Sequence, residues 1–206
     1  MFNKIANYFD FDIAKLGKII RVVISNSVTS IRYGVFEGCS GLKSVTIPES
    51  VTSIAPFAFK GCSGVTSMTI PESVTYIGIY AFHMCSGLTY VTIPSSMKSI
   101  VRGVFEGCSG LISVTIPSSV ITIEVGAFAG CSGLTSVALP ESITSIRDLA
   151  FEGCSALTSM RIPSSITSIG VGAFDGCSGL TSVSIPPTLT DIGEGAFPLG
   201  CIINHI

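Results

Sequence analysis

The chain has 206 residues, a formal net charge of −2 and only 12% charged residues, against a hydrophobic content of 47%. Proteins bind nucleic acid by presenting clustered Lys and Arg to the phosphates, and the sequence has no such cluster, so we expect no nucleic-acid partner. No apolar run approaches the ~20 residues of a membrane-spanning helix, so we expect no membrane insertion. The low charge favours a chain in which most positions face a core or a neighbouring segment.

Residues 1–18 are expected to cap the N-terminal end, either as a helix or as a degenerate repeat. Phe2, Ile5 and Phe9 recur with helical spacing. The segment does not form a typical signal peptide, because two aspartates and an asparagine interrupt its apolar stretch and no small-residue cleavage site follows. Two alternatives stay open for the compartment: a cytosolic protein, or a protein whose signal has been removed.

Residues 19–199 are built from a repeating unit of 23 residues, and its most regular position is a phenylalanine. The phenylalanines are Phe36, Phe59, Phe82, Phe105, Phe128, Phe151, Phe174 and Phe197. A strict period of this length predicts a solenoid in which each unit packs on its neighbours. Parallel stacking would space the units at ~4.8 Å and place the phenylalanines in one buried ladder.

Each unit begins with a predicted strand and continues through two turns. In the first complete copy, Val45 and Ile47 alternate with polar residues, as in a strand, and Pro48 ends it because proline has no N–H for a ladder. A second apolar pair, Val51 and Ile54, predicts a short strand or an extended turn. The Ala-Phe-x-Gly-Cys sequence that follows is too short for a regular helix, and we expect one helical turn that points Phe and Cys inward together.

Residues 200–206 are expected to form an incomplete terminal repeat. Continuing the period places Ile203 and Ile206 in the first two apolar positions of another strand. Exposed strand edges invite pairing with another chain, so Ile203 and Ile206 form a candidate self-association edge. The other explanation is that the chain is a fragment of a longer array.

The repeat resembles the BspA-like leucine-rich repeat family, also called the Treponema-pallidum-type repeat. The resemblance rests on LxxVxIPxSxTxI, as in Leu42 to Ile54, and on AFxGCSGL, as in Ala127 to Leu134, and it extends from about Ile19 to Phe197. It implies a curved leucine-rich-repeat solenoid with a parallel sheet on the concave side and short helical turns or irregular segments elsewhere. It also implies a role in adhesion or protein binding, often at a cell surface or after secretion, and it does not imply an enzyme.

Seven cysteines recur at the same period and raise the question of metal sites or disulfides. They are Cys39, Cys62, Cys85, Cys108, Cys131, Cys154 and Cys177. Zinc sites need clustered ligands, whereas these thiols fall one per coil, and seven cannot pair evenly. The pattern therefore favours buried, reduced thiols that act as small apolar side chains, and we expect no metal or other cofactor.

No catalytic arrangement emerges from the remaining polar residues. His83 lies two positions before Cys85, and residues at that spacing do not face each other. The serines fill repeat positions without a histidine and an aspartate to activate them. Acidic residues recur after the prolines and the phenylalanines, but neutral and basic residues break these rows, which favours a solvated rim over a weak cation site.

The outward side of the main strand is the predicted binding surface, a nearly uncharged Ser/Thr sheet. Its candidate residues are Lys43, Ser44, Thr46, Ser67, Thr69, Tyr90, Thr92, Ser113, Thr115 and Arg161. Binding surfaces use aromatic and arginine side chains as anchors, so Tyr90 and Arg161 are the favoured contacts; the alternative is neutral drift of the repeat. The leading function is a non-catalytic scaffold for binding an unidentified protein ligand. The alternative is a structural module that self-assembles through its C-terminal edge.

Overall fold

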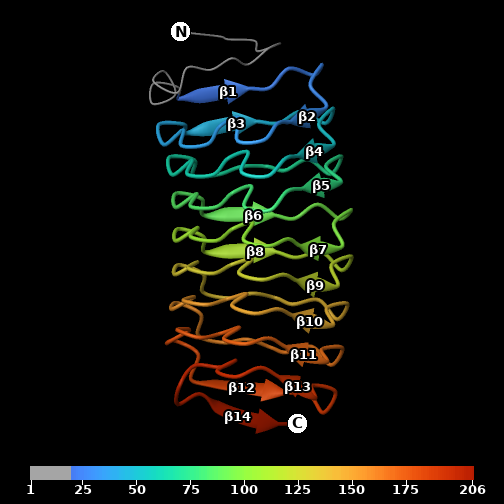
Figure 1. Cartoon of the computed structure of the whole chain (residues 1–206), viewed down its shortest axis with the longest axis vertical. Helices are drawn as coiled ribbons and strands as arrows, with labels where there is room; N and C mark the ends of the chain where they lie inside the picture. Colours follow the sequence, from blue (N-terminus) through green and yellow to red (C-terminus); the bar gives the residue numbers. More distant parts are fainter. Residues whose placement is uncertain (1–19) are drawn as a thin grey trace.

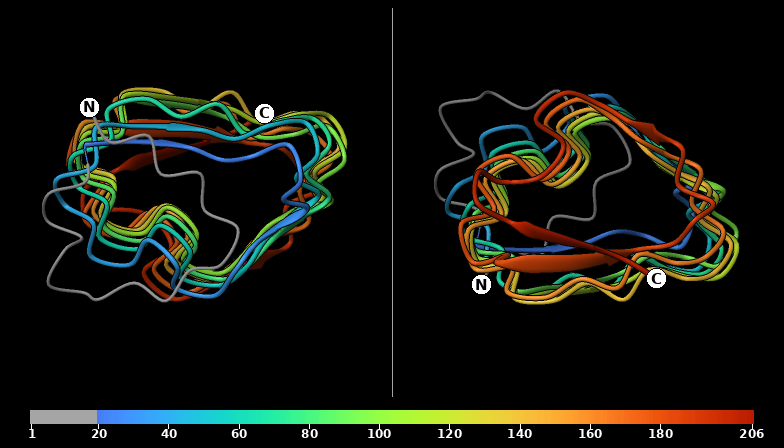
Figure 2. Two further views of the ribbon diagram at one scale, coloured as in Figure 1. Left: turned by 90° about the horizontal axis from the view of Figure 1, so that it is seen from above. Right: turned by 90° about the horizontal axis from the view of Figure 1, so that it is seen from below.

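The structure, a computed structural model, describes residues 20–206, so the predicted cap at residues 1–18 and Ile19 lie outside the described residues. The chain coils about one long axis, and each coil lies on the one before it (Figure 1). Seen along that axis, the coils superpose into one irregular outline (Figure 2). The predicted solenoid of stacked 23-residue units is therefore confirmed.

The main sheet runs along one side of the solenoid and consists of parallel strands from successive coils. Its strands are β1 (Arg21–Val23), β3 (Ser44–Thr46), β6 (Tyr90–Thr92), β8 (Ser113–Thr115), β12 (Ser182–Ile185) and β14 (Ile202–His205). Arg21 pairs with Ser44 and Tyr90 with Ser113, a register of one repeat unit. These strands form three separate pairs, β1–β3, β6–β8 and β12–β14, and single parallel bridges, such as Ser67 with Tyr90, add the same register at three further steps.

A second row of strands, each of two residues, follows the proline turn. These are β2 (Ser30–Ile31), β4 (Ser53–Ile54), β5 (Tyr76–Ile77), β7 (Ser99–Ile100), β9 (Thr122–Ile123), β10 (Ser145–Ile146), β11 (Ser168–Ile169) and β13 (Asp191–Ile192). They confirm the short strand predicted from the second apolar pair. The row is divided into two parallel sheets, β2–β4–β5 and β7–β9–β10–β11–β13.

The interruption between β5 and β7, which we call the seam, is a local loss of hydrogen bonds. At each of the other steps along this row, the amide after the second strand donates to the isoleucine carbonyl of the preceding coil, as Gly78 does to Ile54 at 2.8 Å. Within the described residues, the amide of Val101 has no such bond to Ile77. Met97 fills a position that holds Val or Ile in most other coils, and a cavity of about 10 Å³ beside it is lined by Ile77 and Phe105.

The core is dominated by the predicted phenylalanine ladder. Successive rings from Phe36 to Phe197 have centroids 5.1 to 5.6 Å apart and lie within 14° of parallel. The rings of Phe36 to Phe174 are almost completely buried. Fully burying such a side chain contributes about 1.5–3 kcal/mol, so the ladder is a major part of the stability.

The predicted helical turn at Ala-Phe-x-Gly-Cys is wrong, since residues 20–206 contain no helix. The amide of Cys39 donates to the carbonyl of Phe36 at 3.1 Å, which closes a single tight turn. The amide of Phe36 donates instead to Ala58 in the next coil, at 2.9 Å, and Gly38 has φ +73°. A helix cannot propagate because its amides are committed to the neighbouring coil. Phe36 and Cys39 nevertheless point inward together, as the spacing predicted.

The register predicted for the C-terminal strand is wrong by three residues. Ile203 pairs with Val183, and the amide of Ile206 donates to the carbonyl of Ile185, so the last step is 20 residues rather than 23. The turn after Phe197 is correspondingly shorter than its counterparts. Ile203 therefore occupies the second apolar position of the strand rather than the first, and Ile206 lies just beyond the strand.

Candidate functional site

The candidate residues of the main sheet all lie on its outward side, as predicted. Each is exposed or half-buried, while the residues between them, such as Val45, Val91 and Val114, are buried. We call the ten residues from Lys43 to Arg161 that were predicted above the main-sheet surface. The structure confirms that these side chains share one face; whether they bind a ligand stays a prediction.

Tyr90 is held against the main-sheet surface by two threonines. Its hydroxyl lies 3.0 Å from Oγ1 of Thr115 in the next coil and accepts a hydrogen bond from Oγ1 of Thr92 at 3.1 Å. These hydrogen bonds, the one with Thr115 above all, lower the pKa of Tyr90. The ring is 48% exposed, so the side chain is oriented by its neighbours and still accessible to a ligand.

Arg161 is oriented by a carboxylate from the preceding coil. Its Nη1 donates to Oε1 of Glu141 at 2.6 Å, and Oε2 of Glu141 accepts from the amide and the hydroxyl of Ser164, both at 3.2 Å. The guanidinium holds the pKa of Glu141 below its usual value, with a further contribution from Ser164. Arg161 and Tyr90 are three coils apart, roughly 14 Å at the usual strand spacing, so the structure does not bring them together.

Two of the recurring glutamates that follow prolines, Glu72 and Glu141, stabilise turns of the next coil. Oε2 of Glu72 accepts from the amide of Ser95 at 2.9 Å and from its hydroxyl at 2.7 Å, and these hydrogen bonds lower the pKa of Glu72. Glu141 makes the same contacts with Ser164. Within the part of the chain that the structure describes, no three His, Cys, Asp or Glu side chains are grouped so as to hold a metal ion.

The periodic cysteines form a ladder of buried thiols, as predicted. Each thiol from Cys62 to Cys177 donates to the phenylalanine carbonyl of the preceding coil at 3.1 to 3.3 Å, as Cys85 does to Phe59. All eight cysteines are free, and only Cys201 is partly exposed. Burial raises the pKa of Cys85 and of Cys131 to about 12, so these thiols stay protonated and unreactive at neutral pH.

His83 and Cys85 do not form a pair. The Nε2 atom of His83 lies 3.6 Å from Oε1 of Glu106, and the imidazole meets the ring of Tyr80 edge-on, with centroids 5.6 Å apart. The thiol of Cys85 points into the core toward Phe59. The imidazole is therefore half-buried beside Tyr80 and Glu106, and the sulfur lies in the core.

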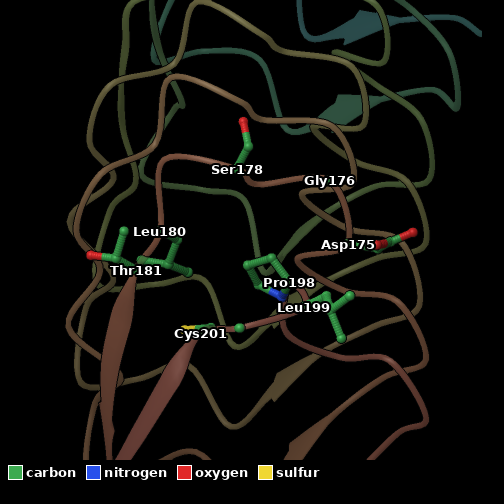
Figure 3. Close-up of a pocket in the computed structure, with 9 residues that line it drawn as sticks. Asp175, Gly176, Ser178, Leu180, Thr181, Pro198, Leu199 and Cys201 are labelled. Carbon is green, nitrogen blue, oxygen red and sulfur yellow. The ribbon is translucent and has the colours of Figure 1, made fainter.

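The candidate self-association edge at Ile203 and Ile206 lies on an exposed strand. All four residues of β14 are exposed, and within the described residues β14 pairs only with β12. Above it, the shortened turn after Phe197 leaves a groove of about 350 Å³. Figure 3 shows its walls, with Ser178, Leu180 and Thr181 from one coil and Pro198, Leu199 and Cys201 from the next.

The sequence reasoning missed a second group of surface side chains, near a position where every coil within residues 20–206 has a positive φ. Glycine occupies this position in five coils, but Phe57, Tyr80 and Leu149 occupy it in the others, with φ of 57° or 58°. The rings of Tyr33, Phe57 and Tyr80 form a column on the surface, which we call the aromatic ridge. Part of the signal was in the sequence, because Phe57, Tyr80 and Leu149 stand in a position that otherwise holds glycine, whereas Tyr33 lies one position earlier in its coil.

The stacked parallel coils with in-register ladders define a repeat solenoid of the leucine-rich class. The sequence profile described as "BspA type Leucine rich repeat region" matches in six copies, over residues 11–120 and 98–206. The chain therefore belongs to the BspA-type leucine-rich repeat family. Such scaffolds are in general non-enzymatic. Residues 20–206 contain no helix long and apolar enough to cross a membrane.

Several solved structures are similar to this chain. A leucine-rich repeat protein from Eubacterium ventriosum is 32% identical over 76% of this chain and 42% of its own, with a TM-score of 0.71. A leucine-rich cell surface protein from Faecalibacterium prausnitzii is 32% identical over 91% of this chain and 59% of its own, with a TM-score of 0.61. The leucine-rich repeat protein of T. pallidum is 29% identical over 90% and 78%, with a TM-score of 0.69.

The chain spans 42% and 59% of the length of the first two of these proteins. No curated protein sequence matches the chain significantly.

Proposed function

We propose that this protein is a non-catalytic scaffold that binds a protein ligand, in an adhesive role at a cell surface or outside the cell, through the main-sheet surface. The observation that carries the proposal is the fixed orientation of Tyr90 and Arg161 on an otherwise nearly uncharged sheet of serine and threonine. The similar protein from F. prausnitzii is a cell surface protein, which supports the same setting here.

The physical basis of binding is an ordered array with two anchors. Tyr and Arg dominate the energetics of many interfaces, and side chains that are already oriented lose less conformational freedom when a ligand docks. The hydroxyls of residues such as Thr46, Thr69 and Ser113 supply hydrogen-bonding groups along the surface at the spacing of the coils. Such a surface suits an extended protein segment that lies along the solenoid axis.

Surface plasmon resonance against immobilised collagen, laminin and fibronectin tests the proposal. We expect saturable binding to at least one of them, weakened at least tenfold by Tyr90→Ala and by Arg161→Ala. Tyr76→Ala is the matched control, because Tyr76 is 52% exposed but lies in the second row of strands. Binding that survives both substitutions, or no binding to any of the three, contradicts the proposal.

A second candidate function is self-assembly through β14, which the exposed edge of that strand favours. Ile203 is 40% and Ile206 is 73% exposed, and within the described residues β14 is hydrogen-bonded on one side only, to β12. Light scattering during size exclusion should then show a dimer that Ile203→Lys converts to a monomer. Ile121→Lys, at a position that is 46% exposed and directly precedes β9, is the control. A wild-type monomer at every concentration excludes this function.

A further inference from the structure

The aromatic ridge is a continuous apolar strip on the turns that follow β2, β4 and β5. The ring centroids of Tyr33 and Phe57 are 5.4 Å apart, as are those of Phe57 and Tyr80. Tyr33 is 67% exposed, and Ile79 and Met84 beside the ridge are 42% and 54% exposed. Phe57 and Tyr80 are half-buried, and Nζ of Lys60 lies 5.3 Å from the centroid of the Phe57 ring. The ridge therefore exposes the Tyr33 ring and parts of the Phe57 and Tyr80 rings over three successive coils.

The chain holds these side chains in an unfavourable backbone conformation. Phe57, Tyr80 and Met84 have φ between 57° and 60°, a region that favours glycine. Hydrogen bonds to the next coil maintain it: the amide of Phe57 donates to Ile79 at 3.3 Å, and that of Tyr80 to Arg102 at 3.1 Å. Backbone strain of this kind clusters at binding sites in proteins, where a side chain must be presented at a particular point.

The ridge ends abruptly in both sequence and structure. Gly103 follows Tyr80 at the same position of the next coil, and the Tyr80 ring covers it so closely that a Cβ there would overlap the ring. Gly126 follows in the coil after that, and the side chain one residue earlier in each of these coils is Arg102 or Val125. The stacked rings of the ridge are thus confined to one patch of the solenoid rather than repeated along it.

Two arginines near the ridge, Arg32 and Arg102, have no ion-pair partner within the described residues. Lys60 is paired with Glu37 at 2.9 Å, and His83 lies 3.6 Å from Glu106, so the two carboxylates beside the ridge already have partners. Arg32 and Arg102 are exposed, and neither forms an ion pair with any residue from 20 to 206. They lie at opposite ends of the ridge, three coils apart, roughly 14 Å at the usual strand spacing.

We propose that the aromatic ridge binds an extended acidic segment of a partner protein. Carboxylates of that segment pair with Arg32 and Arg102, and an apolar or aromatic side chain between them packs on the ridge. An extended chain rises ~3.3 Å per residue, so the two acidic residues are about four or five positions apart. This surface is separate from the main-sheet surface, and the proposal does not depend on binding there.

Selection from a phage-displayed library of random linear nonapeptides tests this proposal. The library is panned on the wild-type chain while the Phe57→Gly/Tyr80→Gly variant is present in excess in solution, so that only ridge-dependent peptides are retained. The variant should fold, because glycine occupies this position in five other coils. We expect enrichment of peptides with two acidic residues four or five positions apart around an apolar or aromatic residue.

Fluorescence anisotropy of the most enriched peptide then measures the contributions of rings and charges. We expect Kd to rise at least tenfold for Phe57→Gly/Tyr80→Gly and for Arg32→Glu/Arg102→Glu. Leu149→Gly, a matched change at the same backbone position outside the ridge, should leave Kd within twofold. No enrichment, enrichment of peptides without paired acids, or equal binding by the ring variant overturns the proposal.

Discussion

Replacing Phe105 by alanine tests the energetic weight of the phenylalanine ladder at its centre. The Phe105 ring is fully buried and stacks between Phe82 at 5.5 Å and Phe128 at 5.6 Å. Phe→Ala changes in protein cores cost about 3–5 kcal/mol, and the cost rises when the cavity cannot collapse. Here the coils are tied to each other by axial hydrogen bonds, such as that from the Phe105 amide to Ala127 at 3.0 Å. We therefore expect a loss of ~4 kcal/mol.

Urea titration followed by far-ultraviolet circular dichroism measures this loss, since the chain has no tryptophan to report unfolding. Phe197→Ala is the matched control, because Phe197 is only partly buried and, within the described residues, stacks on Phe174 alone. We expect the control to lose about 1–2 kcal/mol. A loss below ~1 kcal/mol for Phe105→Ala, or equal losses for both variants, would refute the reasoning.

Three further predictions concern the thiols and the seam. Ellman's reagent without denaturant should label only Cys201 of the eight cysteines, and the rest should react on unfolding. Because burial raises the pKa of Cys85 and Cys131 from 9.0 to about 12, the unfolded chain deprotonates first. The free energy of unfolding should therefore stay constant below about pH 9 and decrease between about pH 9 and 12. The decrease should be smaller in the Cys85→Ala/Cys131→Ala variant. At the seam, within the described residues, the Lys98 amide has no hydrogen bond to Thr75 of the preceding coil, whereas the Ile121 amide donates to the Lys98 carbonyl at 2.9 Å. By hydrogen exchange, the Lys98 amide should therefore exchange roughly tenfold faster than the Ile121 amide.

The 23-residue period predicted most of the fold because stacking couples sequence spacing directly to position. Residues one period apart, such as Val22 and Val45, must face each other across the ladder, and they do. The helical turn was wrong because the pattern of side chains at Phe36 and Cys39 is the same in a helix and in a tight turn. The two structures differ in which carbonyls accept hydrogen bonds from the backbone amides, and here those carbonyls belong to the neighbouring coil.

The candidate site was predicted in part. The alternation of polar and apolar residues was sufficient to place Tyr90 and Arg161 on one face. It did not predict their hydrogen-bond partners, Thr115 and Glu141, because these come from other coils. The register of Ile203 was missed because the prediction assumed 23 residues in every coil. The turn after Phe197 is three residues shorter, and the strands still pair. Phe57 and Tyr80 interrupt a row of glycines in the sequence, but that pattern does not show that their rings stack with Tyr33, which lies at a different position of its coil.

The shortened turn after Phe197 shows how a repeat protein of this kind can acquire a cavity. Three residues are missing from the turn, yet Ile203 still pairs with Val183, so the deletion is absorbed without disturbing either strand. The missing backbone leaves the groove of about 350 Å³ between the coils. The length of this turn can therefore change, by evolution or by design, without changing the pairing of the strands. Shortening the same turn in an inner coil should create a ligand-sized cavity at a chosen position along the solenoid axis.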